Sequence, residues 1–386
     1  MKALRKFIDK QKPHFDLGGK FQKLKSAFDA VETLFYVPDK VTKTGSHIRD
    51  AVDMKRTMIV VFIALIPALL FGMWNIGYQH FLSHGEQPDQ WTMFFYGFLE
   101  MLPIIIVSYG VGLGLEIVFA QIRNHEVNEG FFVSGLLIPM IVPPETPLWQ
   151  IAIAVAFAVI FGKEVFGGTG MNIVNPALTA RAFLFFAYPS DMSGEKVWIS
   201  GLPDILPDTF SGATPLGNAL VGNFDQMPTT YEMFIGIIPG SIGETSVLMI
   251  LIGAIILLAT GVANWRIMFS VFAGGYIMGL LFNLWGLNEY MQMDALNHLL
   301  LGGFAFGAVF MATDPVTGTQ TKKGMYIYGF LIGIIAVLIR VFNPAYPEGM
   351  MLAILLMNVF APLIDHYIIE SNISKRLKRM KIAIKI

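Results

Sequence analysis

A run of four small residues, Ser211-Gly212-Ala213-Thr214, could carry covalent chemistry, because it presents two hydroxyl groups beside a backbone with little side-chain cover. The run lies in a polar segment of about residues 189–230 that interrupts an otherwise apolar chain. A modifying enzyme could therefore reach one of these hydroxyls and esterify it. Alone, such a run is more often a turn whose hydroxyls bond their own backbone. The spacing by itself leaves both interpretations open.

The residue Asp208 extends this pattern, so that an acid precedes Ser211-Gly212-Ala213-Thr214. The full pattern resembles the signature that flavin transferases recognise, in which FMN is attached by a phosphoester to the last threonine. The resemblance makes Thr214 the candidate site of covalent FMN. Asp208, Ser211, Gly212 and Ala213 are then the recognition motif around it.

A second polar cluster, Gly-Gly-Thr-Gly-Met-Asn-Ile-Val-Asn-Pro at residues 167–176, lies between apolar stretches. Its glycines allow the backbone to approach a flat ligand closely. Asn172 and Asn175 each offer a donor and an acceptor, which suits the edge of an isoalloxazine ring. Because Pro176 favours an extended Asn175, the asparagines could instead cap a helix. The spacing is not that of a dinucleotide-binding fingerprint.

Three carboxylates fall within or beside apolar stretches, where a charge is costly and is a candidate functional group: Glu116, Asp314 and Asp365. Hard cations prefer oxygen ligands, so these residues are candidates for the passage of Na⁺ or H⁺. Asp314 could equally begin a turn, and Asp365 could lie near the membrane interface. The sequence does not choose between the two ions.

The composition places these groups in a membrane. Of 386 residues, 54% are hydrophobic and only 14% are charged, which is typical of an integral membrane protein. There is no cysteine, which excludes disulfides, thiolate metal sites and an Fe–S cluster held by this chain alone. Redox chemistry would therefore need an organic cofactor. The N-terminus lacks the apolar core of a cleavable signal.

The basic residues are concentrated at the two ends. Residues 1–56 and the tail 371–386 hold nineteen of the 27 Lys and Arg, so the positive-inside rule places both termini in the cytoplasm. We interpret the basic tail as a topology signal rather than a nucleic-acid site. The segment 188–245 has seven Asp and Glu but one Lys, which predicts an outer-face loop that carries Thr214.

The apolar stretches predict an all-α integral membrane protein with about ten transmembrane or half-spanning helices within residues 57–370. They are residues 58–78, 94–121, 129–140, 151–161, 174–187, 247–263, 268–285, 299–311, 325–341 and 350–369. The third is short and stops at Pro143-Pro144, so we expect a half-helix there.

An internal repeat relates residues of approximately 58–187 to 246–369. Two Asn-Pro-Ala units, at 175–177 and 343–345, lie 168 residues apart, and Gly-Phe pairs at 130–131 and 303–304 precede them in the same order. Repeated halves with broken apolar segments are typical of transporter-like folds with two inverted repeats. Such folds bind ligands where the broken helices meet.

Long ordered stretches of this chain resemble one family, the B subunits of the Na⁺-translocating NADH:quinone oxidoreductases of bacteria. They include Lys12-Pro13-His14-Phe15 and residues 125–132, 163–176, 240–244 and 340–365. The resemblance implies covalent FMN on the threonine that matches Thr214. It also implies a noncovalent riboflavin near Asn172 and Asn175, with Gly168 and Thr169 beside it.

The resemblance further implies that quinone is reduced near the cytoplasmic side. The residues expected there are Gly112, Phe131, Phe132 and Phe185. The family typically has a Gly-Gly pair before its glutamate, whereas this chain has Gly112-Leu113. Glu116 and Asp365 match the family's candidates in sodium passage, and Asp314 joins them as a third expected ion residue. Na⁺ would be bound only transiently.

The partners implied are the other subunits of a six-subunit complex in the bacterial inner membrane, together with a flavin transferase. Electrons would arrive at FMN, pass to riboflavin and then to quinone, with NADH oxidised on another subunit. Two alternatives are the D subunit of the related Rnf complex and a solute channel of similar architecture. The basic N-terminal region argues against the first, and a bound flavin would exclude the second.

Overall fold

The computed structural model describes residues 2–15, 19–21, 25, 28, 32, 36, 44–46, 54–123, 130–192, 197–202, 212–343 and 349–384. Within these residues the protein is helical and contains no strand. Asp208 and Ser211 of the predicted flavin motif lie outside the described residues. A separate helix near the N-terminus, α1 (Lys2–Phe15), precedes the main bundle.

Six described helices are long and apolar enough to cross a bilayer of about 30 Å. They are α3 (Met54–Ser83), α4 (Gln90–Arg123), α6 (Leu148–Gly162, continued by the 3₁₀ turn η2, Glu164–Phe166), α12 (Trp265–Trp285), α15 (Lys322–Phe342) and α16 (Met350–Ile384). Three shorter apolar helices lie among them: α5 (Phe131–Ile141), α7 (Pro176–Ala187) and α11 (Val247–Ala259). The prediction of an all-α, multi-span membrane protein is therefore confirmed.

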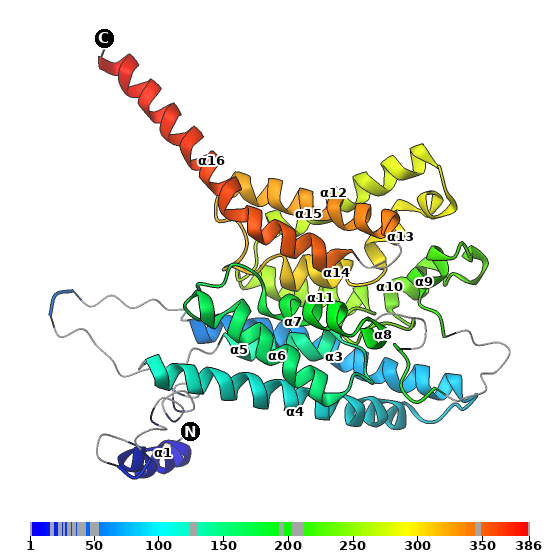
Figure 1. Ribbon diagram of the computed structural model, residues 1–386, viewed down its shortest axis with the longest axis horizontal. Coiled ribbons are helices and arrows are strands. Elements are labelled where there is room, and N and C mark those ends of the chain that lie inside the picture. The colour runs from blue at the N-terminus through cyan, green and yellow to red at the C-terminus, as the bar shows by residue number, and fades with distance from the viewer. Residues whose placement is uncertain are drawn as a thin grey trace.

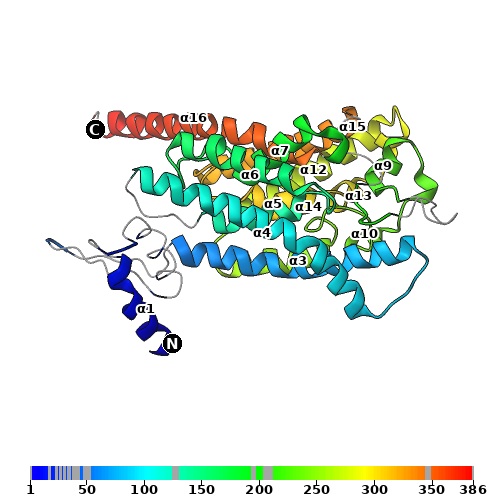
Figure 2. The same ribbon diagram turned by 60° about the horizontal axis from the view of Figure 1, so that its bottom comes forward.

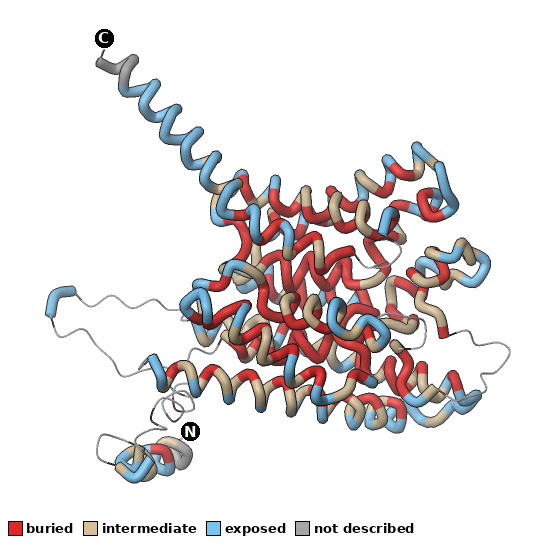
Figure 3. The backbone as a smooth tube through the Cα atoms, in the orientation of Figure 1, coloured by how far each residue is buried: buried red, intermediate tan, exposed pale blue. Residues whose placement is uncertain are grey.

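The helices form two neighbouring groups that share one core. Helices α3 to α7 pack together, while α12, α15 and α16 form the second group, and α11 joins the two by packing against α3 (Figure 1). The buried residues are concentrated in the middle of the bundle, and the outer sides of the long helices are exposed (Figure 3). Exposed apolar side chains on such helices are expected where lipid replaces water.

Glycines allow the long helices to approach closely. A Cβ atom on Gly77 of α3 would lie 1.9 Å from the Met93 carbonyl oxygen, and one on Gly97 of α4 would lie 1.8 Å from that of Met73. Only hydrogen fits at these two places, so α3 and α4 cross almost in backbone contact. This is the small-residue packing by which membrane helices associate.

The predicted half-helix is confirmed as a short helix. Helix α5 has eleven residues, about 16 Å in length, and ends at Val142 before Pro143. Almost all of its residues are buried. Irregular backbone at its end is thus surrounded by protein, as a membrane interior requires.

The predicted apolar segment 299–311 is divided into shorter helical pieces in the structure. The structure has α13 (Ala295–Leu300), one turn of α14 (Phe304–Phe306) and a π-helical turn, η5 (Gly307–Met311). The break falls at Gly302, whose φ is 59°, and at Gly303, where a Cβ would lie 2.3 Å from the Glu244 carboxylate. Apolar composition predicted the segment, but the left-handed backbone at Gly302, a conformation that glycine adopts readily, divides it.

The connection between α7 and α11 contains short helices at the end of the bundle opposite the two termini (Figure 1). They are α8 (Pro189–Met192), α9 (Pro215–Leu220), η3 (Phe224–Gln226) and α10 (Thr230–Ile235). The 3₁₀ turn η4 (Glu289–Gln292) follows α12 at the same end. At the other end, α16 continues well past the bundle (Figures 1 and 2).

Candidate functional site

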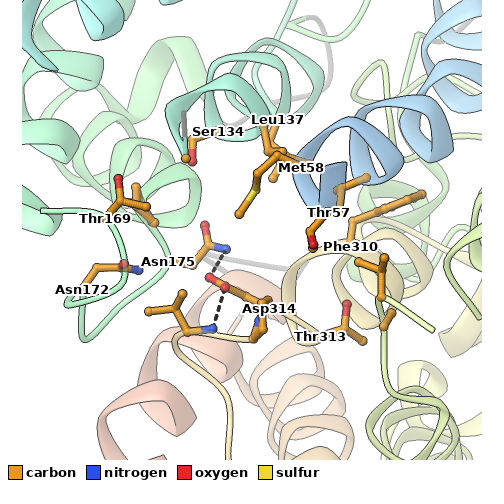
Figure 4. Close-up of a pocket in the computed structure, with 18 of the residues that line it drawn as sticks. Thr57, Met58, Ser134, Leu137, Thr169, Asn172, Asn175, Phe310, Thr313 and Asp314 are labelled. Atoms are coloured by element: carbon orange, nitrogen blue, oxygen red, sulfur yellow. Dashed lines mark hydrogen bonds between the residues drawn. The ribbon is translucent and has the colours of Figure 1, made fainter. Parts of the chain in front are cut away.

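A pocket of about 90 Å³ lies where α3, α5 and α7 begin and where α11 and η5 end (Figure 4). One water needs roughly 10–15 Å³, so the space is several times that size. Its lining is Thr57, Met58, Val61, Gly130, Val133, Ser134, Leu137, Lys163, Thr169, Asn172, Asn175, Pro176, Leu257, Val262, Ala263, Phe310, Thr313, Asp314, Pro315 and Val316. The short helix α5 and the π-helical turn η5, which come from different halves of the chain, therefore contribute to one site.

Asn175 has two roles in the structure. Its Oδ1 accepts hydrogen bonds from the backbone N–H groups of Ala177 (2.9 Å) and Leu178 (3.2 Å), which caps α7. Its Nδ2 donates to Oδ2 of Asp314 at 3.4 Å, across 139 residues of sequence (Figure 4). The two interpretations made from the sequence are thus compatible, since the residue caps a helix and lines the pocket.

Asp314 starts a turn, which is one of the two roles that the sequence allowed for it. Its carboxylate accepts from the backbone N–H of Val316 (3.0 Å) and from the hydroxyl of Thr317 (3.1 Å). Because Asn175 bonds the same carboxylate, a predicted ion residue and a predicted riboflavin residue meet in one place. The sequence alone had placed them in separate sites.

Two more predicted riboflavin residues line the pocket. Thr169 has a buried hydroxyl oxygen with no hydrogen-bond partner among the described residues, and Asn172 donates through Nδ2 to the Val174 carbonyl at 3.2 Å. Gly168, with a φ of 95°, is not one of the lining residues and lies close to the Glu164 carboxylate. A buried polar atom without a partner is costly, which indicates that a polar ligand or water belongs at Thr169.

Two neighbouring ion pairs, with no net charge between them, lie beside the pocket. The ammonium of Lys163 donates to Oε1 of Glu116, and both side chains are about 5% exposed. Next to them, Arg123 pairs with Glu164 at 3.1 Å. The other oxygen of Glu116, Oε2, is buried and has no partner among the described residues. Sequence reasoning missed Lys163, although a lysine directly after an apolar helix was a signal for it.

Three of the four predicted quinone residues are brought together. The ring of Phe131 packs so closely on Gly112 that a Cβ there would lie 2.0 Å from ring atoms. Phe132 follows, and its carbonyl accepts a hydrogen bond from Tyr109 at 2.6 Å. Phe185 lies nine residues along α7 from Pro176, about 14 Å from the pocket end, so the structure does not bring it to the others.

Asp365 lies apart from the pocket, against the start of α15. Its carboxylate accepts from the backbone N–H groups of Gln320 (2.7 Å) and Thr321 (3.0 Å) and from the Thr321 hydroxyl (2.6 Å). These contacts fasten α16 to the segment that precedes α15. The structure therefore gives Asp365 a structural role of its own.

Thr214 is the residue that caps α9. Its Oγ1 accepts a hydrogen bond from the backbone N–H of Gly217 at 3.1 Å, and its side chain is half-buried. Gly212 adopts a φ of 68°, which a turn before α9 requires. Helix α9 and the pocket lie towards opposite ends of α3, a helix of about 45 Å (Figure 1).

No group of three or more His, Cys, Asp or Glu that could hold a metal ion occurs among the described residues. The site is instead an apolar pocket whose lining includes hydroxyl and amide groups, the carboxylate residue Asp314 and the cationic residue Lys163. Such a lining suits an organic ligand with polar edges.

Comparison with known proteins gives consistent matches over the full chain. The NQR2, RnfD, RnfE family matches residues 41–374. A protein of Ectopseudomonas mendocina, named as the B subunit of Na(+)-translocating NADH-quinone reductase, is 47% identical over 98% of this chain and 99% of its own length. Proteins of the same name from Chromohalobacter salexigens (46%; 98% and 97%) and Pseudomonas aeruginosa (45%; 98% and 99%) are similar.

Proposed function

The chain belongs to the NQR2, RnfD, RnfE family, and from this premise we propose that it is the membrane-embedded B subunit of a Na⁺-translocating NADH:quinone reductase. The observation that carries the proposal is full-length identity of 45–47% to proteins of that name, with almost no unmatched sequence on either side. The apolar helices long enough to span a membrane agree with this role. The match extends through the basic N-terminal region, which favours the B subunit over the Rnf counterpart.

Thr214 is the proposed attachment point of FMN. A cap uses a lone pair of the hydroxyl oxygen, so the O–H hydrogen of Thr214 remains available for replacement by a phosphoryl group. The Thr214 side chain is only partly buried, which supports access by a flavin transferase, and the positive φ of Gly212 supports a turn before it. A bound flavin supplies one-electron chemistry that the twenty side chains lack.

The pocket at the other end of the bundle is the proposed riboflavin site. Thr169, Asn172 and Asn175 supply hydroxyl and amide groups, and the positive-φ turn at residues 167–170 lets the backbone come close to a flat ring. The unpartnered Thr169 hydroxyl supports this fit. Asn175 orients the ligand from the cap of α7, a position that its own hydrogen bonds fix.

The quinone site is proposed beside Gly112, Phe131 and Phe132, with Phe185 outside it. The proposed ion residues are Glu116, near the pocket, Asp314, within its lining, and Asp365, which lies apart from the pocket and also accepts bonds from Gln320 and Thr321. Both termini are proposed to be cytoplasmic in the bacterial inner membrane, with the α9 end outside. The proposed partners are the other subunits of the complex.

The experiment that tests the FMN proposal is the intact mass of the purified chain, co-expressed with a flavin transferase. The expected result is an added mass equal to FMN less one water, lost in Thr214→Ala and retained in Thr230→Ala, an exposed hydroxyl control outside the recognition motif. No added mass, with the transferase active on another substrate, would overturn covalent flavinylation. A chain without any bound flavin would then favour the channel alternative, which an ion-flux measurement tests.

A further inference from the structure

Of the four charged residues beside the pocket, Lys163 is the one that lines it. Lys163 is a lining residue, whereas its partner Glu116 is not. Lys163 is the last residue before η2, and its carbonyl accepts from the backbone N–H of Gly168 at 3.1 Å. The same residue therefore holds the glycine turn through its backbone, pairs with Glu116 through its side chain and belongs to the lining of the pocket.

The pair is incompletely satisfied. Glu116 uses Oε1 for Lys163, while its buried Oε2 has no hydrogen-bond partner among the described residues. An ammonium group has three N–H donors and can serve more than one acceptor. The stability of a buried charge depends strongly on its partner. Any second acceptor in the pocket therefore competes with Glu116 for the Lys163 ammonium group.

Within this group of four charged residues, the second cation does not replace Lys163. The neighbouring Arg123 is committed to Glu164, through both its carboxylate (3.1 Å) and its carbonyl (2.7 Å). Across these four residues the charges sum to zero. Negative charge added to the pocket would therefore act first on Lys163, which is the cation of the group that lines it.

We propose that Lys163 is a positioning residue shared between Glu116 and the ligand of the pocket, so that the electrical state of the ligand and that of Glu116 are coupled. This inference rests on the proposed function, in which the ligand is a flavin that accepts an electron from the flavin on Thr214. The electron adds negative charge to the ligand, Lys163 keeps its proton, and no covalent bond forms or breaks. Lys163 then favours the reduced ligand, and Glu116 opposes this by competing for Lys163.

The test is a double-substitution cycle in the whole complex, with the reduction potential of the noncovalent flavin as the readout. Lys163→Gln should lower the potential by at least about 59 mV, the equivalent of a tenfold loss in a one-electron equilibrium. Glu116→Gln should raise it, because Lys163 becomes free to face the ligand. The same glutamate substitution made in Lys163→Gln should have almost no effect, and Lys163→Arg should stay close to the wild type.

A variant with one unpaired buried charge could fail to assemble, so the neutral pair Lys163→Gln/Glu116→Gln is the second measurement. Its potential should still be below that of the wild type, since the positive member of the removed pair belongs to the pocket lining and the negative member does not. A matched control is Arg181→Gln/Glu244→Gln, which neutralises another buried ion pair that does not line the pocket and should leave the potential unchanged.

Two failures are distinguishable. If Asn172→Ala and Asn175→Ala complexes keep their full content of noncovalent flavin, the pocket is not the flavin site and the proposed function is wrong at that point. The second failure is one in which flavin content falls in those variants but the potential does not respond as expected. The coupling through Lys163 is overturned if the Lys163 and Glu116 substitutions shift the potential in the same direction, if their effects are additive, or if neither shifts it.

Discussion

Replacing Gly112 by alanine tests the proposed quinone region with a single methyl group. A Cβ at this position would lie 2.0 Å from the Phe131 ring, whereas ordinary contact begins at 3.4 Å, so the ring must move by about 1.4 Å. Phe131 is only 1% exposed and has little room to move. Overpacking of this kind costs typically about 1–3 kcal/mol.

The same helix supplies matched controls. Gly110 and Gly114 lie within one turn of Gly112, and a Cβ on either meets nothing within 4 Å. Alanine there should be neutral or slightly stabilising, because alanine is the better helix former. In thermal unfolding of the purified complex, Gly112→Ala should lower the midpoint by roughly 1–4 °C for a chain of this size, and the two controls should not.

The functional assay is the dependence of the NADH-driven rate on quinone concentration. Because the displaced Phe131 ring belongs to the proposed quinone site, Gly112→Ala should raise the KM for quinone several-fold while flavin content stays at the wild-type level. If Gly112→Ala behaves like Gly114→Ala in both stability and KM, the close packing of Phe131 on α4 and its link to quinone binding are wrong.

Three further predictions concern other parts of the chain. Asp365→Ala should destabilise the junction of α16 with Thr321 by roughly 1.5–3 kcal/mol, measured by thermal unfolding, with Asp365→Asn less affected because one oxygen remains. Thr169→Val should reduce noncovalent flavin content without lowering the unfolding midpoint, since the lost hydroxyl bonds no described residue. The backbone N–H of Thr229, and then its hydroxyl, lower the pKa of Glu232 below its ordinary 4.5. The cap of α10 is therefore stabilised above that pH and weakens as pH falls through the lowered pKa. The protection of the α10 amides, corrected for their intrinsic exchange rates, should fall about two- to fivefold there, and Glu232→Gln should remove this pH dependence.

Local sequence features predicted much of the fold. Uncharged apolar runs indicated the long helices, and Pro143-Pro144 predicted the early end of α5, because a proline pair cannot continue a helix. Asn175-Pro176 predicted the start of α7 from backbone geometry alone. Each of these features depends only on residues that are adjacent in the sequence, so it can be predicted without knowledge of the fold.

Features that depend on distant contacts could not be predicted in this way. Gly303 packs against the Glu244 carboxylate, 59 positions earlier in the chain, and the apolar composition of residues 299–311 does not display that contact. Lys163 and Glu116 are 47 residues apart, and only the packing of α6 against α4 brings them together. The meeting of Asn175 with Asp314 likewise needs both halves of the chain in place.

NADH-driven Na⁺ uptake into inverted membrane vesicles, with and without this chain in the complex, tests the proposed function as a whole. We expect uptake that needs both the chain and an added quinone, that persists when a protonophore collapses the proton gradient, and that is lost in Thr214→Ala. Undiminished Na⁺ uptake with Thr214→Ala, or uptake that the protonophore abolishes, would contradict a flavin-dependent primary sodium pump that contains this chain.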